Sequence, residues 1–191
     1  MIFFNGVILK LEGNIGVAAY GVIANLSLVI ISIYTGMAQG MQPIMSRYFG
    51  GGNWRNVRKI LKYGMIMMLM FSVLIYAGIF FGAEQITNVF NSEGDAMLQK
   101  IAVEGLKLYF LACPFAGFNI IISVYFTSIE RPLPANIISV LRGFVVIIPL
   151  AFLLAAVAGM LGVWCTFPVT EFLVMLVGVG FWRKMELIRK K

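Results

Sequence analysis

Long uncharged stretches separated by short charged segments set the pattern of this chain. The first uncharged stretch, residues 13–46, runs for 34 residues, and others occupy 63–83, 108–129, 143–170 and 172–182. A helix needs about 20 apolar residues to cross a hydrocarbon core of about 30 Å, because each residue advances it by about 1.5 Å. The pattern therefore predicts a protein whose helices cross a membrane.

Five complete transmembrane helices follow from these stretches. Their bounds, to within about 2–4 residues, are 15–46, 57–82, 98–128, 134–157 and 162–183. Residues 1–9 precede them and are mostly apolar, but nine helical residues reach only about 13 Å, which is too short to cross. The predicted fold class is an all-α, polytopic membrane bundle of five complete transmembrane helices plus an N-terminal helix remnant.

The composition favours a membrane protein over a soluble domain. Hydrophobic residues make up 61% of the chain and charged residues 12%, against about 25% charged in soluble proteins. In a soluble protein the net charge of +7 would suggest nucleic acid as a partner. Here the basic residues lie between apolar stretches, where they record membrane orientation instead, so nucleic-acid binding is excluded as a function class.

The usual signatures of enzymes, cofactors and metal sites do not explain the polar residues. The glycine-rich segment at 50–53 lacks the lysine and hydroxyl residue that a phosphate-binding loop requires, so nucleotide binding is rejected. Cys113 and Cys165 fall inside apolar stretches and are interpreted as small buried side chains, not as a disulfide or metal ligands. No catalytic residue, cofactor or metal site is predicted, and the chain is not expected to be an enzyme.

The segments that connect the predicted helices differ in charge. The first carries +5, the second −2, the two short turns that follow carry zero, and the tail after residue 182 carries +4. Because cytoplasmic segments are enriched in lysine and arginine, the first connection and the tail are both assigned to the cytoplasm. Four helices separate these two segments, and an even number of crossings agrees with that assignment. The predicted location is the cell inner (plasma) membrane with a cytoplasmic C-terminus.

Two amides, Gln39 and Gln42, lie at membrane depth on one face of the first predicted helix. An amide in lipid is costly unless it is paired or hydrated, so both side chains are expected to face the interior of the bundle. One interpretation is packing between helices, eased by the small residues Gly36, Ala38 and Gly40. The other is the wall of a water-filled cavity, and the sequence leaves both open.

The third predicted helix contains Pro114 and Gly117, a pair that weakens backbone hydrogen bonding and permits a bend. Asn119 follows as a polar group near the middle of the helix. A structural interpretation is a kink with Asn119 hydrogen-bonded to another helix. A functional interpretation is a gating bend at which Phe115 and Asn119 face a substrate.

Arg142 and Glu171 are the only charged residues predicted deep in the bilayer. Arg142 lies about 12 Å from the cytoplasmic start of its helix, and Glu171 about 14 Å from the outer start of the next helix. In a core of about 30 Å these depths nearly coincide, so the two side chains are expected to meet. The structural interpretations are an ion pair that fixes helix packing or an Arg142 side chain that extends to the cytoplasmic side, and the functional interpretation is a site that couples transport to an ion.

Three stretches, in this order along the chain, resemble the multidrug and toxic compound extrusion transporters. The first is GMAQGMQPIMSRYFGGGNWRNVRKIL at 36–61, with its Gln-Pro helix end, glycine-rich turn and basic helix start. The second is YFTSIERPLPANIISVLRGFVVIIPLAFLL at 125–154, which includes Arg142, and the third is MLGVWCTFPVTEFL at 160–173, which ends near Glu171. The resemblance covers the chain from about residue 17 to its tail.

This resemblance implies one lobe of a transporter that has twelve helices in two six-helix lobes. The basic tail suits the C-terminal lobe, with residues 1–9 as the end of the seventh helix, so residues 1–191 are expected to be a fragment without the N-terminal lobe. The family exports amphipathic, often cationic, drugs by antiport with protons or sodium. The acids that bind sodium in some members lie in the seventh and tenth helices, and residues 108–129 contain none, so a sodium site is not supported here.

The function predicted from the sequence is therefore that of a secondary active drug exporter. Its partners would be a small-molecule substrate, a coupling cation (H⁺ or Na⁺), the lipid bilayer and the missing lobe. Gln39, Gln42, Phe115 and Asn119 are the candidate substrate-binding residues, and the coupling ion would bind either in the missing half or on Glu171. The alternatives are a lipid-linked saccharide or lipid flippase of the same superfamily and a membrane scaffold that does not transport.

Overall fold

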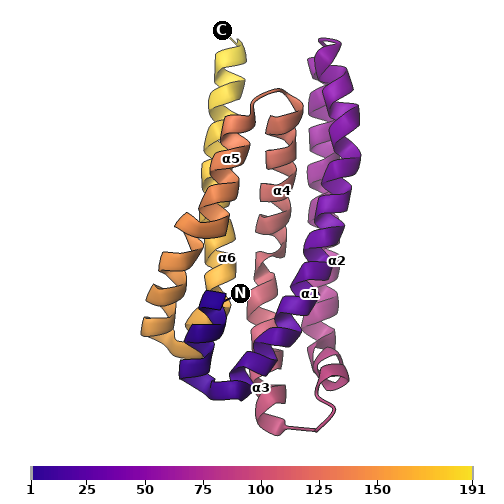
Figure 1. The fold of residues 1–191 in the computed structure, drawn as a ribbon. Coiled ribbons are helices and arrows are strands. Elements are labelled where there is room, and N and C mark those ends of the chain that lie inside the picture. Colours follow the sequence, from indigo (N-terminus) through magenta and orange to yellow (C-terminus); the bar gives the residue numbers. More distant parts are fainter. Residues whose placement is uncertain (1, 191) are drawn as a thin grey trace.

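The computed structural model describes residues 2–190, with side chains described for 4–187. This part of the chain is helical and contains no β-strand, so the predicted all-α class is confirmed (Figure 1). The elements are α1 (Ile2–Gly50), α2 (Trp54–Phe90), α3 (Ala96–Tyr109), the short 3₁₀ turn η1 (Phe110–Ala112), α4 (Cys113–Ser128), α5 (Pro132–Val140), the π-helical turn η2 (Leu141–Val145) and α6 (Ile147–Lys190).

Within the described residues, four continuous helical stretches are long and apolar enough to cross a membrane, namely Phe4–Gly50, Trp54–Phe90, Ala96–Ser128 and Pro132–Leu187. The first and last contain a glycine with left-handed backbone, Gly13 (φ 61°) and Gly159 (φ 56°), and the chain reverses direction in both (Figure 1). Glycine populates this region because it has no Cβ. The break at Gly159 lies between the predicted helices 134–157 and 162–183, and Gly13 separates the N-terminal remnant from the rest of α1.

The reversal after Gly159 brings the chain back very close to itself. A Cβ atom on Gly162 would overlap the carbonyl oxygen of Leu154. Glycine is therefore required at position 162 for the two antiparallel parts of this stretch to approach each other. The tight turn brings the start of the last predicted helix against the end of the one before it.

The third predicted helix changes its backbone pairing just before Pro114. There α3 passes into α4 through η1, and Pro114 lies in the first turn of α4. A proline has no N–H and its ring crowds the carbonyl group four residues earlier, here that of Phe110. Regular α-helical pairing therefore gives way to 3₁₀ pairing at this point, while the stretch as a whole continues through the bundle.

The glycine-rich segment at 50–53 ends α1, as predicted. Gly52 has a positive φ of 70°, and the Asn53 side chain accepts a hydrogen bond from the backbone N–H of Asn56 at 3.2 Å, which caps α2. This connection lies at the same end of the bundle as the C-terminus (Figure 1). Arg58 and Glu186 join the two segments by an ion pair of 2.6 Å, so the two predicted cytoplasmic regions lie together.

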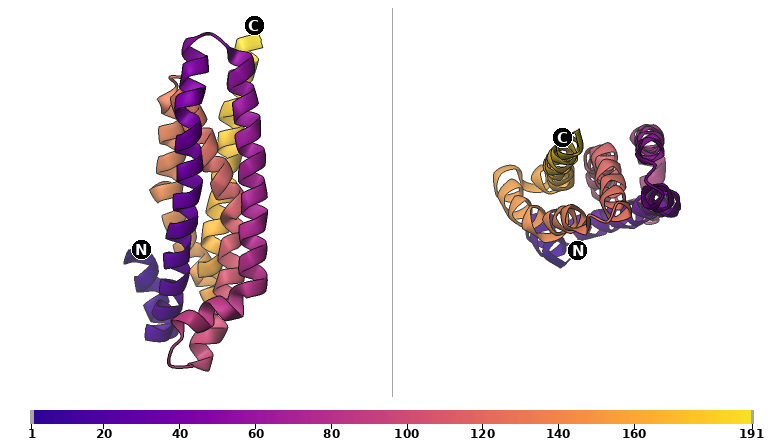
Figure 2. Two further views of the ribbon diagram at one scale, coloured as in Figure 1. Left: turned by 90° about the vertical axis from the view of Figure 1, so that its right-hand side faces the viewer. Right: turned by 90° about the horizontal axis from the view of Figure 1, so that it is seen from above.

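The centre of the bundle is α4, which packs against α1, α2, α5 and α6. Seen along the bundle, α4 lies between α2 and α6 (Figure 2). By contrast α2 is peripheral, and much of its apolar surface is exposed, including Met67, Met70 and Leu74. Such a surface is unfavourable in water and natural in lipid, in agreement with the membrane pattern of the sequence.

Candidate functional site

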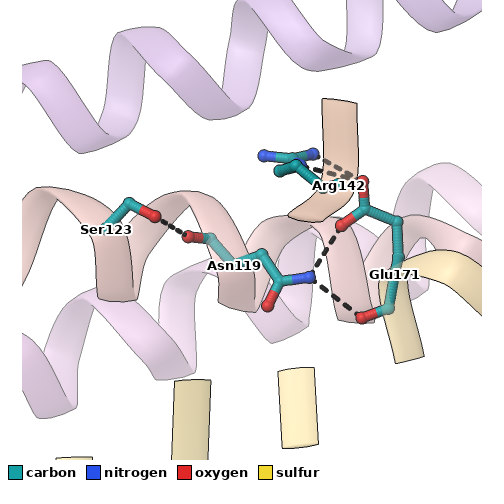
Figure 3. Close-up of polar contacts among 4 residues, drawn as sticks. All are labelled: Asn119, Ser123, Arg142 and Glu171. Carbon is teal, nitrogen blue, oxygen red and sulfur yellow. Dashed lines mark hydrogen bonds and ion pairs between the residues drawn. The ribbon is translucent and has the colours of Figure 1, made fainter. Parts of the chain in front are cut away.

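A polar cluster with a buried carboxylate at its centre joins α4, η2 and α6 (Figure 3). Its members are Asn119 on α4, Arg142 on η2 and Glu171 on α6. The Arg142 guanidinium donates to Glu171 Oε1 from Nε at 3.0 Å and from Nη2 at 2.7 Å. The Asn119 amide donates to Glu171 Oε2 at 2.7 Å and to the Glu171 backbone oxygen at 2.9 Å. The predicted meeting of Arg142 and Glu171 is confirmed.

Glu171 is the centre of this cluster and its most buried charge. Its side chain is 1% exposed, whereas that of Arg142 is 21% exposed. A buried carboxylate is costly unless hydrogen-bond donors replace the lost water, and here donors reach both of its oxygens. The arrangement holds the carboxylate rigidly and ties α4 and α6 to the π-helical turn.

Local backbone geometry explains how Arg142 reaches the cluster. In η2 the N–H of Val146 donates to the carbonyl of Leu141 at 3.0 Å, a π-helical pairing five residues apart. Pro149 has no N–H and leaves the Val145 carbonyl without its ordinary helical donor, which favours a break from α-helical pairing here. Such π-turns within α-helices occur frequently at functional sites.

The cluster also contains an acceptor that is not used. Asn119 Oδ1 is buried and has no hydrogen-bond partner among the residues that the structure describes. The backbone oxygen of Asn119 accepts from the Ser123 hydroxyl at 2.7 Å (Figure 3). The side-chain NH₂ group of Asn119 therefore donates to Glu171, while its Oδ1 can still accept a hydrogen bond.

The structure does not bring the four predicted substrate-binding residues together. Asn119 is fully buried and bonded to another helix, so the structural interpretation of this residue is the one the geometry supports. Phe115 is half-buried and packs edge-on against Phe172 at 5.3 Å between ring centres. Both predicted amides lie elsewhere, on α1.

The expectation that Gln39 and Gln42 both face the interior of this lobe is wrong for Gln39. Gln39 is exposed on α1 and Gln42 is half-buried. The buried side of this part of α1 is instead formed by Tyr34, Ala38 and Met45. Around the helix axis, position 39 is turned from this row by about a third of a turn and position 42 by about a sixth, so Gln39 is exposed and Gln42 lies at the edge of the buried side. A role in binding substrate stays a prediction for both.

Sequence reasoning missed a second polar contact inside the bundle. The Tyr34 hydroxyl lies 3.0 Å from the Ser72 hydroxyl, which also donates to the Met68 carbonyl at 2.7 Å and lies 3.3 Å from the Cys113 carbonyl. This contact joins α1, α2 and the start of α4 beside the 3₁₀ turn that precedes Pro114. Ser72 could have indicated this contact from the sequence, because it is a hydroxyl residue inside the long apolar stretch 63–83.

Comparisons with known proteins agree on one family. Residues 1–153 match the MatE family. The chain is 24% identical over 176 residues to the FAD transporter of Shewanella oneidensis, covering 88% of this chain and 38% of that protein. It is 23% identical over 180 residues to the multidrug export protein MepA of Staphylococcus aureus, covering 92% of this chain and 39% of that protein.

Solved structures show the same fold. An outward-facing multidrug resistance MATE family transporter of the MOP superfamily superposes with a TM-score of 0.90 at 20% identity, over 100% of this chain and 43% of that one. A MOP superfamily transporter from Pyrococcus furiosus gives a TM-score of 0.90 at 21% identity, with the same coverage. The chain thus spans less than half the length of the relatives it matches.

Proposed function

The chain belongs to the MatE family of membrane transporters, and we propose that it forms the C-terminal lobe of a two-lobe secondary transporter. The family match over residues 1–153 is the main observation that supports a role in transport. The superposition of the whole chain on 43% of a MATE transporter supports the assignment to one lobe. A second lobe would complete the path for the substrate.

The proposed activity is export of amphipathic, often cationic, compounds by antiport with protons or sodium. The similarity to the multidrug export protein MepA supports this substrate class. In this proposal Gln39 and Gln42 face the second lobe, because the amide of Gln39 is exposed on α1 and needs a hydrated surface rather than lipid. The second candidate is transport of an anionic dinucleotide, which the similarity to the FAD transporter favours.

Within this proposal, Glu171 is a structural residue and the coupling cation binds elsewhere. The carboxylate is 1% exposed and both of its oxygens already accept hydrogen bonds from Arg142 and Asn119. A group that relays protons must exchange them with water, and this carboxylate has little contact with water. Asn119 accordingly holds Glu171 and not a substrate.

Ethidium and FAD efflux from proteoliposomes test the proposed function. The 191-residue chain is reconstituted alone and together with the other half of its transporter, under an imposed proton or sodium gradient. We expect gradient-driven efflux only from the two-lobe assembly, with ethidium favoured over FAD. Efflux by the chain alone would mean that copies of this chain supply both lobes, and efflux of FAD alone would establish the second candidate. Failure of both assays would overturn the transport proposal.

We further propose that the connection between α1 and α2 and the C-terminus face the cytoplasm of a cell whose inner membrane holds the protein. Five basic residues and no acid lie from Arg47 to Lys62, at the same end as the tail. In intact cells, an impermeant maleimide should label Ser92→Cys but should label Asn53→Cys only after permeabilisation. Both positions are exposed, and a background without Cys113 and Cys165 removes other thiols. The reverse labelling would invert the topology.

A further inference from the structure

A groove lies between α2 and α6, and the transport proposal gives it no role. Both helices pack on α4, and an apolar hollow of about 490 Å³ opens between them beside Arg58, Lys62 and Trp182. A second hollow of about 350 Å³ continues it toward Pro114 and Met175. The two hollows share Met65 and Phe118 in their linings, so they are neighbours along α2, and together they are called the groove here.

The depth of this groove matches one leaflet of a bilayer. Its lining along α2 begins at Arg58 and ends at Leu69, a rise of eleven residue steps or about 16 Å along the helix axis. Half of a hydrocarbon core is about 15 Å thick. The groove therefore begins at the basic end of the bundle and ends near the middle of the membrane.

Charge is confined to one end of the groove. Arg58, Lys62 and Glu186 line the mouth, whereas the deeper part is lined by apolar side chains such as Met68, Leu69 and Phe115. Arg58 pairs with Glu186 across the mouth at 2.6 Å, so their charges balance. Lys62 then gives the mouth of the groove a net positive charge. Trp182 also lies there and is 37% exposed, as expected of an indole at a membrane interface.

The surroundings of the groove are apolar and exposed. Ile66 and Leu69 on α2, and Phe172 and Leu176 on α6, are each at least 40% exposed. No residue of α1, which carries Gln39 and Gln42, contributes to the lining. The groove thus opens on a surface suited to lipid tails and away from the polar amides of the proposed substrate path.

We propose that this groove binds one anionic phospholipid of the cytoplasmic leaflet. The headgroup phosphate would lie at Lys62 and Arg58, and one acyl chain would run along Met65 and Phe118 toward the middle of the membrane. A zwitterionic lipid would fill the same apolar space but would gain less at the mouth, because a net positive site favours a net negative headgroup. The lipid would join α2 to α6, two helices that otherwise meet through the Arg58–Glu186 ion pair at this end.

Native mass spectrometry of the full 191-residue chain tests the headgroup. The probes are phosphatidylglycerol and phosphatidylcholine with identical acyl chains. We expect one tightly retained phosphatidylglycerol and a loss of retention of about fivefold in Lys62→Gln, since one basic residue contributes about that factor. Lys59→Gln is the matched control, because Lys59 is exposed on the same helix but does not line the groove. Equal retention of both lipids, or equal effects of both variants, would overturn the proposal.

A second measurement locates the acyl chain independently of charge. Met65→Trp should fill the groove and reduce phosphatidylglycerol retention, whereas Met67→Trp, at an exposed position outside the lining, should not. Phosphatidylglycerol with brominated tails should quench the fluorescence of Trp182. The variant Trp182→Phe identifies that contribution, because it lacks this fluorophore. Absence of quenching, together with cross-linking of the groove to another polypeptide, would show that a protein covers this face. Neither measurement depends on transport, so both remain informative if the proposed function fails.

Discussion

Replacing Arg142 with glutamine is expected to lower the free energy of unfolding of the bundle by about 3–5 kcal/mol. The change leaves the Glu171 carboxylate, which is 1% exposed, with Asn119 as its remaining side-chain donor. Denaturant unfolding of the purified chain in detergent, followed by tryptophan fluorescence, measures the loss.

Glu171→Gln is the informative comparison, because the two halves of the pair differ in exposure. The Arg142 side chain is 21% exposed and can extend toward water when its partner is lost. Glu171→Gln should therefore destabilise the chain less than Arg142→Gln, and the double variant should be more stable than Arg142→Gln alone. If Glu171→Gln is the more damaging change, the burial of these side chains does not determine the energetics.

The sequence predicted the large features of this fold because lipid imposes simple constraints. Uncharged length alone located the helical stretches, and Gly13, Gly52 and Gly159, which have positive φ in the structure, lie in the gaps between the predicted segments. Depth along consecutive antiparallel helices was enough to predict that Arg142 meets Glu171. Each of these inferences rests on local composition and a fixed rise per residue.

Features that depend on how a helix is rotated about its own axis were harder to predict from the sequence. Asn119 was recognised as a polar group that needs a partner, but its bond to Glu171 depends on how α4 is turned relative to α6. The π-turn at Arg142 changes the phase of the helix by one residue, and no regular period predicts it. Gln39 and Gln42 share a face in sequence, yet only packing decides whether that face is covered.

Exchanging the two charges, in the double variant Arg142→Glu/Glu171→Arg, is expected to recover most of the stability that Arg142→Gln loses. The swap re-forms an ion pair between the same two helical stretches. Asn119 can adapt to it, because rotation of its amide presents Oδ1, which has no partner in the described structure, to the guanidinium introduced by Glu171→Arg. Full recovery is not expected, since an arginine side chain is longer than the glutamate it replaces in a closed site.

The same double variant separates a structural ion pair from a proton relay. If Glu171 serves only to hold the helices, the swapped two-lobe assembly should regain most of its gradient-driven ethidium efflux together with its stability. A relay needs a carboxylate at position 171, so a relay role would give a stable, correctly assembled protein whose proton-driven efflux stays more than tenfold below the parent. The burial of Glu171 and the hydrogen bonds to both of its oxygens favour recovery of both properties. Stability measured beside efflux on the same preparation is the control, because it distinguishes a folded protein without coupling from one that has not folded.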